Sequence, residues 1–338
     1  MIQGKTIKGE ESQALEIIED WKEDKKRGML AIVGNKFLGK KAFAHHLQKK
    51  VGLPCVEISM TSRILQKEDV FEVFCKSLHI EVDNHHALLE HLLSMPPTTF
   101  VISKAHMCVL RRVDGYDGMR ELLQIMLQSG HHHFWMCTFT LHTWLFLDGP
   151  ATPINVDVFR AVIELPPRNT FELRNWIQDV FHSLNKKLDF KMLYPEKASK
   201  RVQRRTERAY WRLLCEEAGG NAYIALLLMF QGMSEEEDML RVHMFEQPII
   251  HSDVYEDDQV LFVLMTLVIH DGLTLDEIKV TLNVDLDLVQ AHCRLLRSLN
   301  IVKESQTGVI QIHNLYWLSV TRLLVQKRLI YMGKQWNS

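Results

Sequence analysis

A strand-like run, a glycine loop and a helix-like run follow one another near the start of this chain. Residues 29–33 are apolar, residues 34–41 contain two glycines, and residues 42–51 have a helical pattern. Gly34, Gly39 and Lys40 keep the spacing G-x-x-x-x-G-K, in which backbone N–H groups converge on a phosphate at a helix N-terminus. We therefore expect an α/β fold in which this glycine loop, with Asn35, binds nucleotide phosphates.

The residues that would hold a metal ion beside such a loop are missing. A Ser or Thr hydroxyl is expected directly after Lys40, but the sequence has Lys41. The apolar run 99–102 leads into Ser103 and Lys104, where an acidic box would place an Asp that orients Mg²⁺ and a Glu that activates water. The sequence therefore argues against hydrolysis by this site alone, and we predict no metal site.

Lys41 and Lys104 are expected to lie close together, in the space that Mg²⁺ normally fills. Two buried ammonium groups are costly unless an anion neutralises them. One hypothesis is that they replace the charge of the metal, so that ATP or ADP is bound without Mg²⁺. A second is that both lysines point to solvent beside an empty pocket. A third is a true NTPase whose carboxylates come from Asp114 or Asp117.

Strand-like and helix-like runs alternate through residue 165, which predicts a parallel five-stranded sheet covered on both faces. The expected strands are 29–33, 55–58, 100–102, 134–139 and 161–165, and the expected helices are 42–51, 67–79, 85–93 and 118–130. We predict three domains: this core over residues 1–165, an α-helical lid over 166–250, and a winged helix-turn-helix over 251–338. The last rests on three helical runs and a short hairpin.

This layout resembles that of the AAA+ ATPases, specifically the compact ones with a C-terminal winged helix, such as origin-recognition and STAND-type ATPases. Lys8-Gly9-Glu10-Glu11 and the helix-like run 13–23 are similar to the entry helix of that family. In these terms the Walker A motif is degenerate at Lys41, and the Walker B motif at Ser103 and Lys104. The resemblance implies an AAA+ core that assembles into oligomers.

Three further positions resemble functional residues of the same family. Thr138, at the end of the fourth strand, is similar to the first sensor. Asn221 lies in a Gly-Gly-Asn sequence similar to the second sensor, although Ala222 and Tyr223 replace the expected Pro and Arg. Arg160 precedes the fifth strand, where the resemblance implies an arginine finger that would act on a neighbouring subunit.

Residues 186–212 contain ten Lys or Arg and only three acids. Five arginines in this segment recur with the spacing of one helix face: Arg201, Arg204, Arg205, Arg208 and Arg212. Such a stripe is typical of a surface that tracks a nucleic-acid backbone or meets an acidic partner, and also of a solvated helix face.

The net charge of −2 gives no global attraction to nucleic acid or to an anionic membrane, and no apolar run is long enough for a bilayer. Six widely spaced cysteines are expected to be reduced thiols of a cytoplasmic protein. The sequence favours a catalytically degenerate AAA+ subunit that regulates or scaffolds an assembly, either a homo-oligomer or one with an active AAA+ paralogue. The alternative is a DNA-binding module of replication, transposition or mobile-element defence that uses the winged helix and the arginines.

Overall fold

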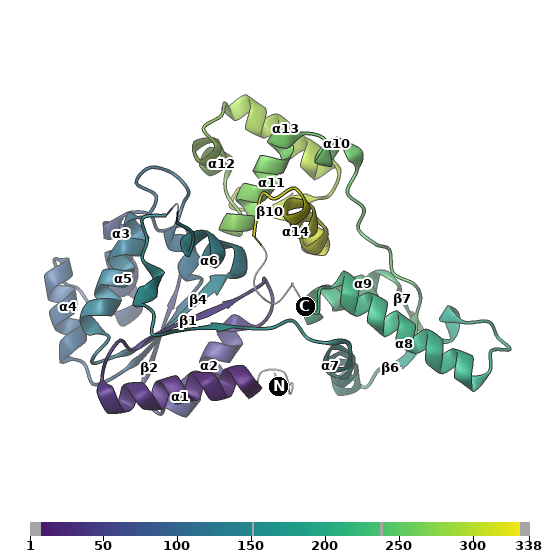
Figure 1. Ribbon diagram of the computed structural model, residues 1–338, viewed down its shortest axis with the longest axis horizontal. Coiled ribbons are helices and arrows are strands. Elements are labelled where there is room, and N and C mark those ends of the chain that lie inside the picture. The colour runs from purple at the N-terminus through teal and green to yellow at the C-terminus, as the bar shows by residue number, and fades with distance from the viewer. Residues whose placement is uncertain (1–7, 151, 237–238, 332–338) are drawn as a thin grey trace.

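The structure is a computed structural model that describes residues 8–150, 152–236 and 239–331. It has three parts, which follow one another along the chain (Figure 1). An α/β core lies on the left of the view, a lid on the right, and a helical C-terminal part above the gap between them. The first seven residues of the predicted core and the last seven of the predicted winged helix lie outside the described residues.

A five-stranded sheet with all strands parallel forms the core, in the order β2-β3-β4-β1-β5. The strands are β1 (Met29–Gly34), β2 (Cys55–Ser59), β3 (Thr99–Ser103), β4 (Phe134–Thr140) and β5 (Ala161–Glu164). Every residue of β1, β3 and β4 is buried, as expected for the central strands of a sheet covered on both faces. The predicted parallel sheet is confirmed. The glycine loop begins at Gly34, the last residue of the inner strand β1.

Helices cover both faces of the sheet. Helices α1 (Lys8–Asp24) and α2 (Lys40–Val51) pack on one face, in a cluster that includes Trp21 and Phe134. Helices α3 (Lys67–Leu78), α4 (His85–Ser94) and α5 (Asp117–Ser129) pack on the other, where the rings of Phe100 and Trp135 stack 4.2 Å apart. A short helix, α6 (Leu141–Leu147), follows β4, and 3-10 turns lie at Ala105–Cys108 and Val156–Val158.

The helices of the lid are α7 (Thr170–Ser183), α8 (Lys200–Glu217) and α9 (Ala222–Gln231). The lid also contains a small sheet in the order β6-β8-β7 that the sequence did not reveal. Its strands are β6 (Lys187–Asp189), β7 (Met233–Glu236) and β8 (Met239–Val242). Each segment is only three or four residues long, which is too short to show the alternating pattern that marks a half-buried strand, and β6 and β7 are mostly polar.

The C-terminal part has the element order of a winged helix. After a single turn, α10 (Ser252–Tyr255), come α11 (Asp258–His270), α12 (Leu275–Leu282) and α13 (Leu286–Ser298). The hairpin β9 (Val302–Glu304) and β10 (Ile310–Ile312) follows, and α14 (Trp317–Gln326) packs against α11. The apolar core of this part continues into the lid, so the two share one cluster of buried side chains.

Within the described ranges, no single helix is long and apolar enough to cross a membrane. Helices α8 and α9 meet that test of length and composition only as a pair, which is bent by 119°. Both contribute buried side chains to the lid core, among them Trp211, Leu214 and Ile224.

Candidate functional site

The glycine loop, residues 34–41, folds around the side chain of Lys40. Gly39 precedes α2 with a φ of 80°, a conformation that suits a residue without a side chain. The Lys40 ammonium donates hydrogen bonds to the carbonyl oxygens of Gly34 and Asn35, at 2.8 and 2.7 Å. Burial lowers the pKa of Lys40 to about 8. The loop thus holds a poorly hydrated cation that an anionic ligand would stabilise.

A cavity of about 790 Å³ opens against this loop, within the size range of small-molecule sites. All three parts of the chain line this loop cavity, including Tyr223 of the lid and Gln311 and Asn314 of the winged helix. Five of its lining residues are lysines: Lys36, Lys40, Lys41, Lys104 and Lys303. Among the described residues, Asp271 is the one acid that lines it. The balance of charge suits a ligand with several negative charges.

Lys41 and Lys104 both line the loop cavity, but they differ in their partners. Lys41 forms an ion pair with Glu57 of β2, and His45 Nε2 lies 3.1 Å from the other oxygen of that carboxylate. Lys104 is exposed, and its backbone N–H donates to Thr138 Oγ1 at 2.9 Å. The Glu57 carboxylate therefore offsets part of the charge that the sequence appeared to leave unbalanced.

Thr138, the residue similar to the first sensor, accepts a hydrogen bond from the backbone of Lys104. It therefore contacts the segment Ser103-Lys104, which stands where an acidic box is expected. Thr138 is 3% exposed and lines the loop cavity beside Ser103. The Ser103 hydroxyl is buried and has no hydrogen-bond partner within the described structure. A buried hydroxyl of this kind is a donor available to a ligand in the cavity.

The winged helix closes over the glycine loop through Asp271, the residue that ends α11. Its Oδ1 lies 2.7 Å from Lys36 Nζ, and its Oδ2 lies 3.6 Å from His106 Nε2. Burial alone would raise the pKa of Asp271, but His106 and Lys36 hold it well below its usual range. The Lys36 ammonium also lies 5.6 Å from the ring centre of Trp317 in α14.

A second contact fixes the winged helix to the core through Arg63, which follows β2. Its Nε donates to Glu277 Oε1 at 2.9 Å, and its terminal nitrogens donate to the carbonyls of Val109 at 2.7 Å and Gly272 at 2.9 Å. Only 7% of the Arg63 side chain is exposed. Because a buried guanidinium needs such partners, this contact holds the two parts in one arrangement.

The lid reaches the glycine loop through Asn221. The Asn221 side chain caps α9 by accepting from the backbone N–H of Tyr223 at 3.0 Å, and it donates to the carbonyl of Lys36 at 2.6 Å. The rings of Phe37 and Tyr223 lie 4.6 Å apart. Lid and winged helix therefore meet the loop at the same residue, Lys36.

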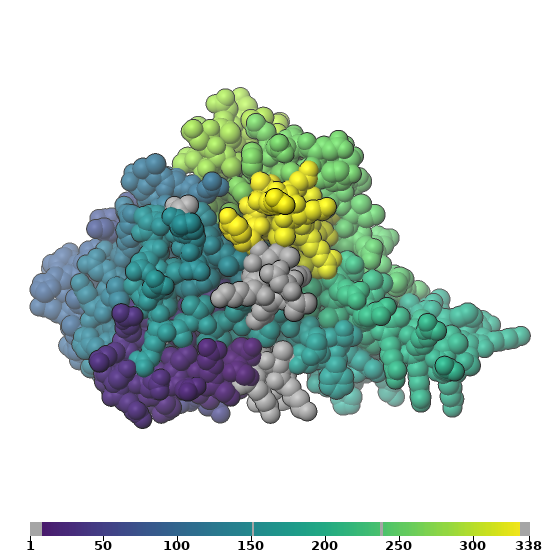
Figure 2. Space-filling model, viewed as in Figure 1, coloured from purple at the N-terminus to yellow at the C-terminus, as the bar shows by residue number. Residues whose placement is uncertain are grey.

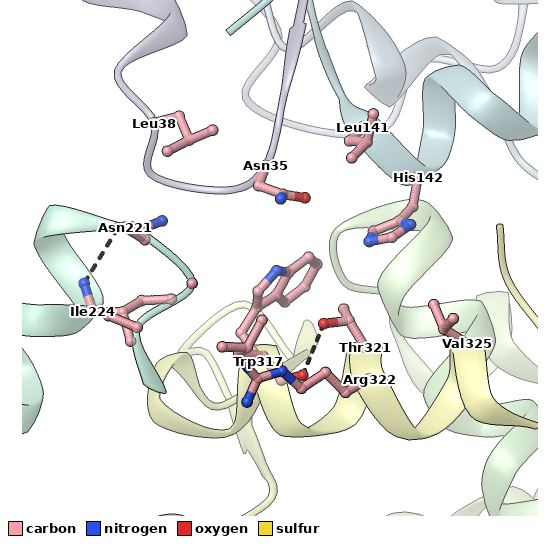
Figure 3. A pocket seen from close by; sticks show the side chains of 13 residues that line it. Asn35, Leu38, Leu141, His142, Asn221, Ile224, Trp317, Thr321, Arg322 and Val325 are labelled. Carbon is pink, nitrogen blue, oxygen red and sulfur yellow. Dashed lines mark hydrogen bonds between the residues drawn. The ribbon is translucent and has the colours of Figure 1, made fainter. Parts of the chain in front are cut away.

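The Asn35 side chain points away from the loop cavity, into a second cavity of about 40 Å³ (Figure 3). There it faces Trp317, with His142 and Asn221 on either side. This space suits one or two water molecules and is too small for a nucleotide base. Asn35 was predicted to bind nucleotide, and its side chain does not line the loop cavity.

Arg160 lies at the other end of the sheet from the glycine loop, since its N–H pairs with the carbonyl of Met29 at the start of β1. Its guanidinium binds both oxygens of Asp24 at 2.9 and 3.0 Å and the carbonyl of Lys26 at 2.8 Å. The hydrogen bonds with Asp24 are the main reason that the pKa of Arg160 is raised. The predicted arginine finger is thus bound to α1 in this chain.

Neither Asp114 nor Asp117 lines the loop cavity, and Asp117 instead pairs with Arg120 at 2.7 Å. The five stripe arginines are exposed on α8 of the lid, far along the chain from this site. Sequence reasoning missed Asp271, which lines the cavity, and also Arg63 and Glu57, which bind Glu277 and Lys41 beside it. No local pattern marks them, because their partners lie in other parts of the fold.

Solved structures are similar to this chain over almost its whole length. The Aeropyrum pernix ORC2 protein, solved in ADPNP–ADP complexes, matches with a TM-score of 0.51 over 97% of this chain and 96% of that chain, at 12% identity. The chain has the fold of an AAA+ ATPase. At this identity the likeness is one of fold alone.

Two further AAA+ structures are similar over most of their length. Cdc6p from Pyrobaculum aerophilum matches at 13% identity over 97% of this chain and 96% of that one, with a TM-score of 0.43. The Thermotoga maritima RuvB Holliday junction branch migration motor matches at 14% identity over 93% of each chain, with a TM-score of 0.42. No family model matches the sequence, and no curated protein does.

Proposed function

We propose that this chain is a catalytically degenerate AAA+ subunit that binds ATP or ADP without hydrolysing it and acts as a regulator or scaffold. The observation that carries the proposal is the charge of the loop cavity, where five lysines and one acid line a space of about 790 Å³. An AAA+ fold with such a cavity beside its glycine loop suits a nucleotide polyphosphate.

The chain's own residues supply what such a ligand needs. Lys40, now bonded to two loop carbonyls, would turn its ammonium to the phosphates, and the loop would offer its N–H groups. Lys104 and Lys303 would approach from the core and the winged helix, and Ser103 Oγ would donate a hydrogen bond. The bound nucleotide would supply the negative charge that this group of lysines lacks.

The same residues do not suit Mg²⁺. Lys41 and Ser103 stand where active enzymes have the hydroxyl and the Asp carboxylate that hold this ion, and the neighbouring ammonium groups of Lys41 and Lys104 repel a cation. Where the structure describes the chain, no group of three His, Cys, Asp or Glu side chains is arranged to hold a metal. Hydrolysis needs a group that takes a proton from water, and the acidic-box segment offers Ser103 and Lys104 instead.

Nucleotide content tests the proposal directly. Protein purified without added nucleotide should release ATP or ADP on denaturation, and a fluorescent ATP analogue should bind equally well with EDTA and with Mg²⁺. Lys40→Ala should weaken this binding at least tenfold, whereas Lys49→Ala, on the exposed far end of α2, should not. Mg²⁺-dependent turnover by the isolated chain, or no saturable binding in either buffer, contradicts the proposal.

The proposed regulatory role follows from how the site is enclosed. Because lid and winged helix both contact Lys36, a ligand on the loop would bias the arrangement of all three parts. We propose that partners, either further copies of this chain or an active AAA+ paralogue in the cytoplasm, respond to that arrangement. Mass measurement of the native complex tests this, and a monomer under all conditions argues against it.

A DNA-binding module remains the second candidate, because four stripe arginines are exposed and have no ion-pair partner among the described residues. They are Arg201, Arg204, Arg205 and Arg208. The winged helix supports this role less well, since Arg297 of α13 pairs with Glu304 and the helix begins with Asp285 and Asp287. DNA binding through the arginines should weaken steeply with salt.

A further inference from the structure

An apolar groove of about 380 Å³ runs along α8 of the lid, away from the loop cavity. One face of α8 forms its floor, with Thr206, Ala209, Tyr210 and Leu213 at the spacing i, i+3, i+4, i+7. Met192 and Met244 form its walls, and they are 55% and 57% exposed. Exposed methionines beside a helical groove are typical of surfaces that bind other helices.

A buried polar atom also lies in this lid groove. Tyr210 is 3% exposed and lines the groove, yet its hydroxyl has no hydrogen-bond partner in the part of the chain described. Buried hydroxyl groups are normally paired. A small shift of the floor that exposes this hydroxyl would let it donate to a carbonyl or carboxylate of a ligand in the groove.

The arginine stripe borders the groove along its length. Arg205, Arg208 and Arg212 each precede a floor residue by one position, which places them about 100° around the helix from the floor. Val202, which is 44% exposed, lies one turn before Thr206 and extends the apolar face of α8. Arg201 precedes Val202 by one position, as the other three arginines precede their floor residues. Arg212 has a weak, exposed pair with Glu216 at 3.8 Å, and Arg205 and Arg208 have none among the described residues.

We propose that the lid groove binds an acidic amphipathic helix of a partner protein. Its apolar side chains would fill the groove over the two turns of α8 between Thr206 and Leu213, and its carboxylates would pair with the stripe. The lid projects from the rest of the molecule, which leaves α8 accessible (Figures 1 and 2). The groove lies outside the nucleotide site and does not depend on nucleotide binding.

The groove favours a peptide over a nucleic acid. A phosphate backbone would use the arginines and leave the methionine walls and the apolar floor exposed, whereas an amphipathic helix uses both. The grooves that bind single strands offer aromatic rings for base stacking. Here Tyr210 is buried in the floor and packs against Phe190, Trp211 and Phe245, and the other ring that lines the groove is the imidazole of His243, which lies within hydrogen-bond distance of Ser234.

Fluorescence anisotropy with the full chain tests this. The probe is a labelled 18-residue helical peptide with Leu at i, i+3, i+4, i+7 and Glu along one flank, and its control is a scrambled peptide of the same composition. Three double variants are compared with the native chain. Met192→Gln with Met244→Gln alters the walls, Arg205→Gln with Arg208→Gln alters the stripe, and Lys49→Gln with Lys50→Gln is a charge-matched control on exposed positions of α2.

The wall and stripe variants should each weaken peptide binding about tenfold, since each removes part of the contact. The control variant and Lys40→Ala should bind the peptide as the native chain does, which separates this inference from nucleotide binding. The scrambled peptide should bind at least tenfold more weakly.

Three results would overturn the inference: no binding at 100 µM peptide, equal binding of the scrambled peptide, or full binding by the wall variant. A 20-base-pair DNA duplex completes the test. If the duplex binds more tightly than the peptide and only the stripe variant weakens it, the surface is a nucleic-acid site instead.

Discussion

Asp271→Asn is the most informative change at the loop cavity, because it removes one charge and keeps the shape. Asp271 has a φ of 56°, a left-handed conformation that asparagine also adopts readily. Its carboxylate lies 2.7 Å from Lys36 Nζ, and each side chain is 13% exposed. The substitution therefore leaves the Lys36 ammonium mostly buried without its opposite charge.

The expected cost is about 2 kcal/mol of unfolding free energy. Removing one partner of a fully buried ion pair costs about 3–5 kcal/mol. The exposed fraction reduces this cost, and the asparagine carbonyl can still accept a hydrogen bond from Lys36. The pKa of Asp271 lies below its usual range, so this stabilisation is present at neutral pH and is lost only as the pH falls through the acid range.

Urea unfolding followed by tryptophan fluorescence measures the effect, and Trp317 near Lys36 serves as a local probe. A double-mutant cycle with Lys36→Met isolates the pair, and its coupling energy should be about 1.5 kcal/mol. The exposed pair Asp117–Arg120 is the matched control, with an expected coupling of less than about 0.5 kcal/mol. If the two cycles give the same coupling, the winged helix is not held to the loop by charge.

Three further predictions concern other contacts of the same site. Binding of an ATP analogue should weaken as the pH rises above about 8, because the Lys40 ammonium then loses its proton, and the Lys40→Ala variant should lack this pH dependence. Arg63→Met should lower the unfolding free energy by about 3 kcal/mol in urea, and Arg63→Lys should not restore it, because an ammonium cannot reproduce the forked contacts with Glu277 and two carbonyls. Asn221→Ala should cost about 1–2 kcal/mol by removing the cap of α9, and faster proteolysis between core and lid should accompany it; unchanged proteolysis would contradict its role at Lys36.

Much of the fold could be predicted because its elements carry local signals. The buried strand β1 is a continuous apolar run, β4 is apolar except for two threonines, and α9 and α11 begin directly after the capping residues Asn221 and Asp257. Helix α6 was missed because Leu141–Leu147 continues the apolar run of β4 without a glycine or proline between them. Strands β7 and β8 were missed because each is only four residues long, which is too short for a strand pattern to stand out.

Only part of the candidate site could be predicted from the sequence. The glycine loop and the altered acidic box lie in short motifs, so Lys40, Lys41 and Lys104 could be anticipated at the cavity, whereas Lys303 of β9 could not. The acids that pair with lysines of the cavity could not either, since Glu57 comes from the edge strand β2 and Asp271 from a different part of the chain. An ion pair between segments that are far apart in the chain produces no periodic pattern in the sequence.

The position of Lys36 has a mechanical consequence. Lid and winged helix both bind this one residue, so a ligand that moves the loop at Lys36 would disturb both contacts in one step. The two outer parts would then respond together and not one after the other, and a partner that contacts either of them would receive the same signal.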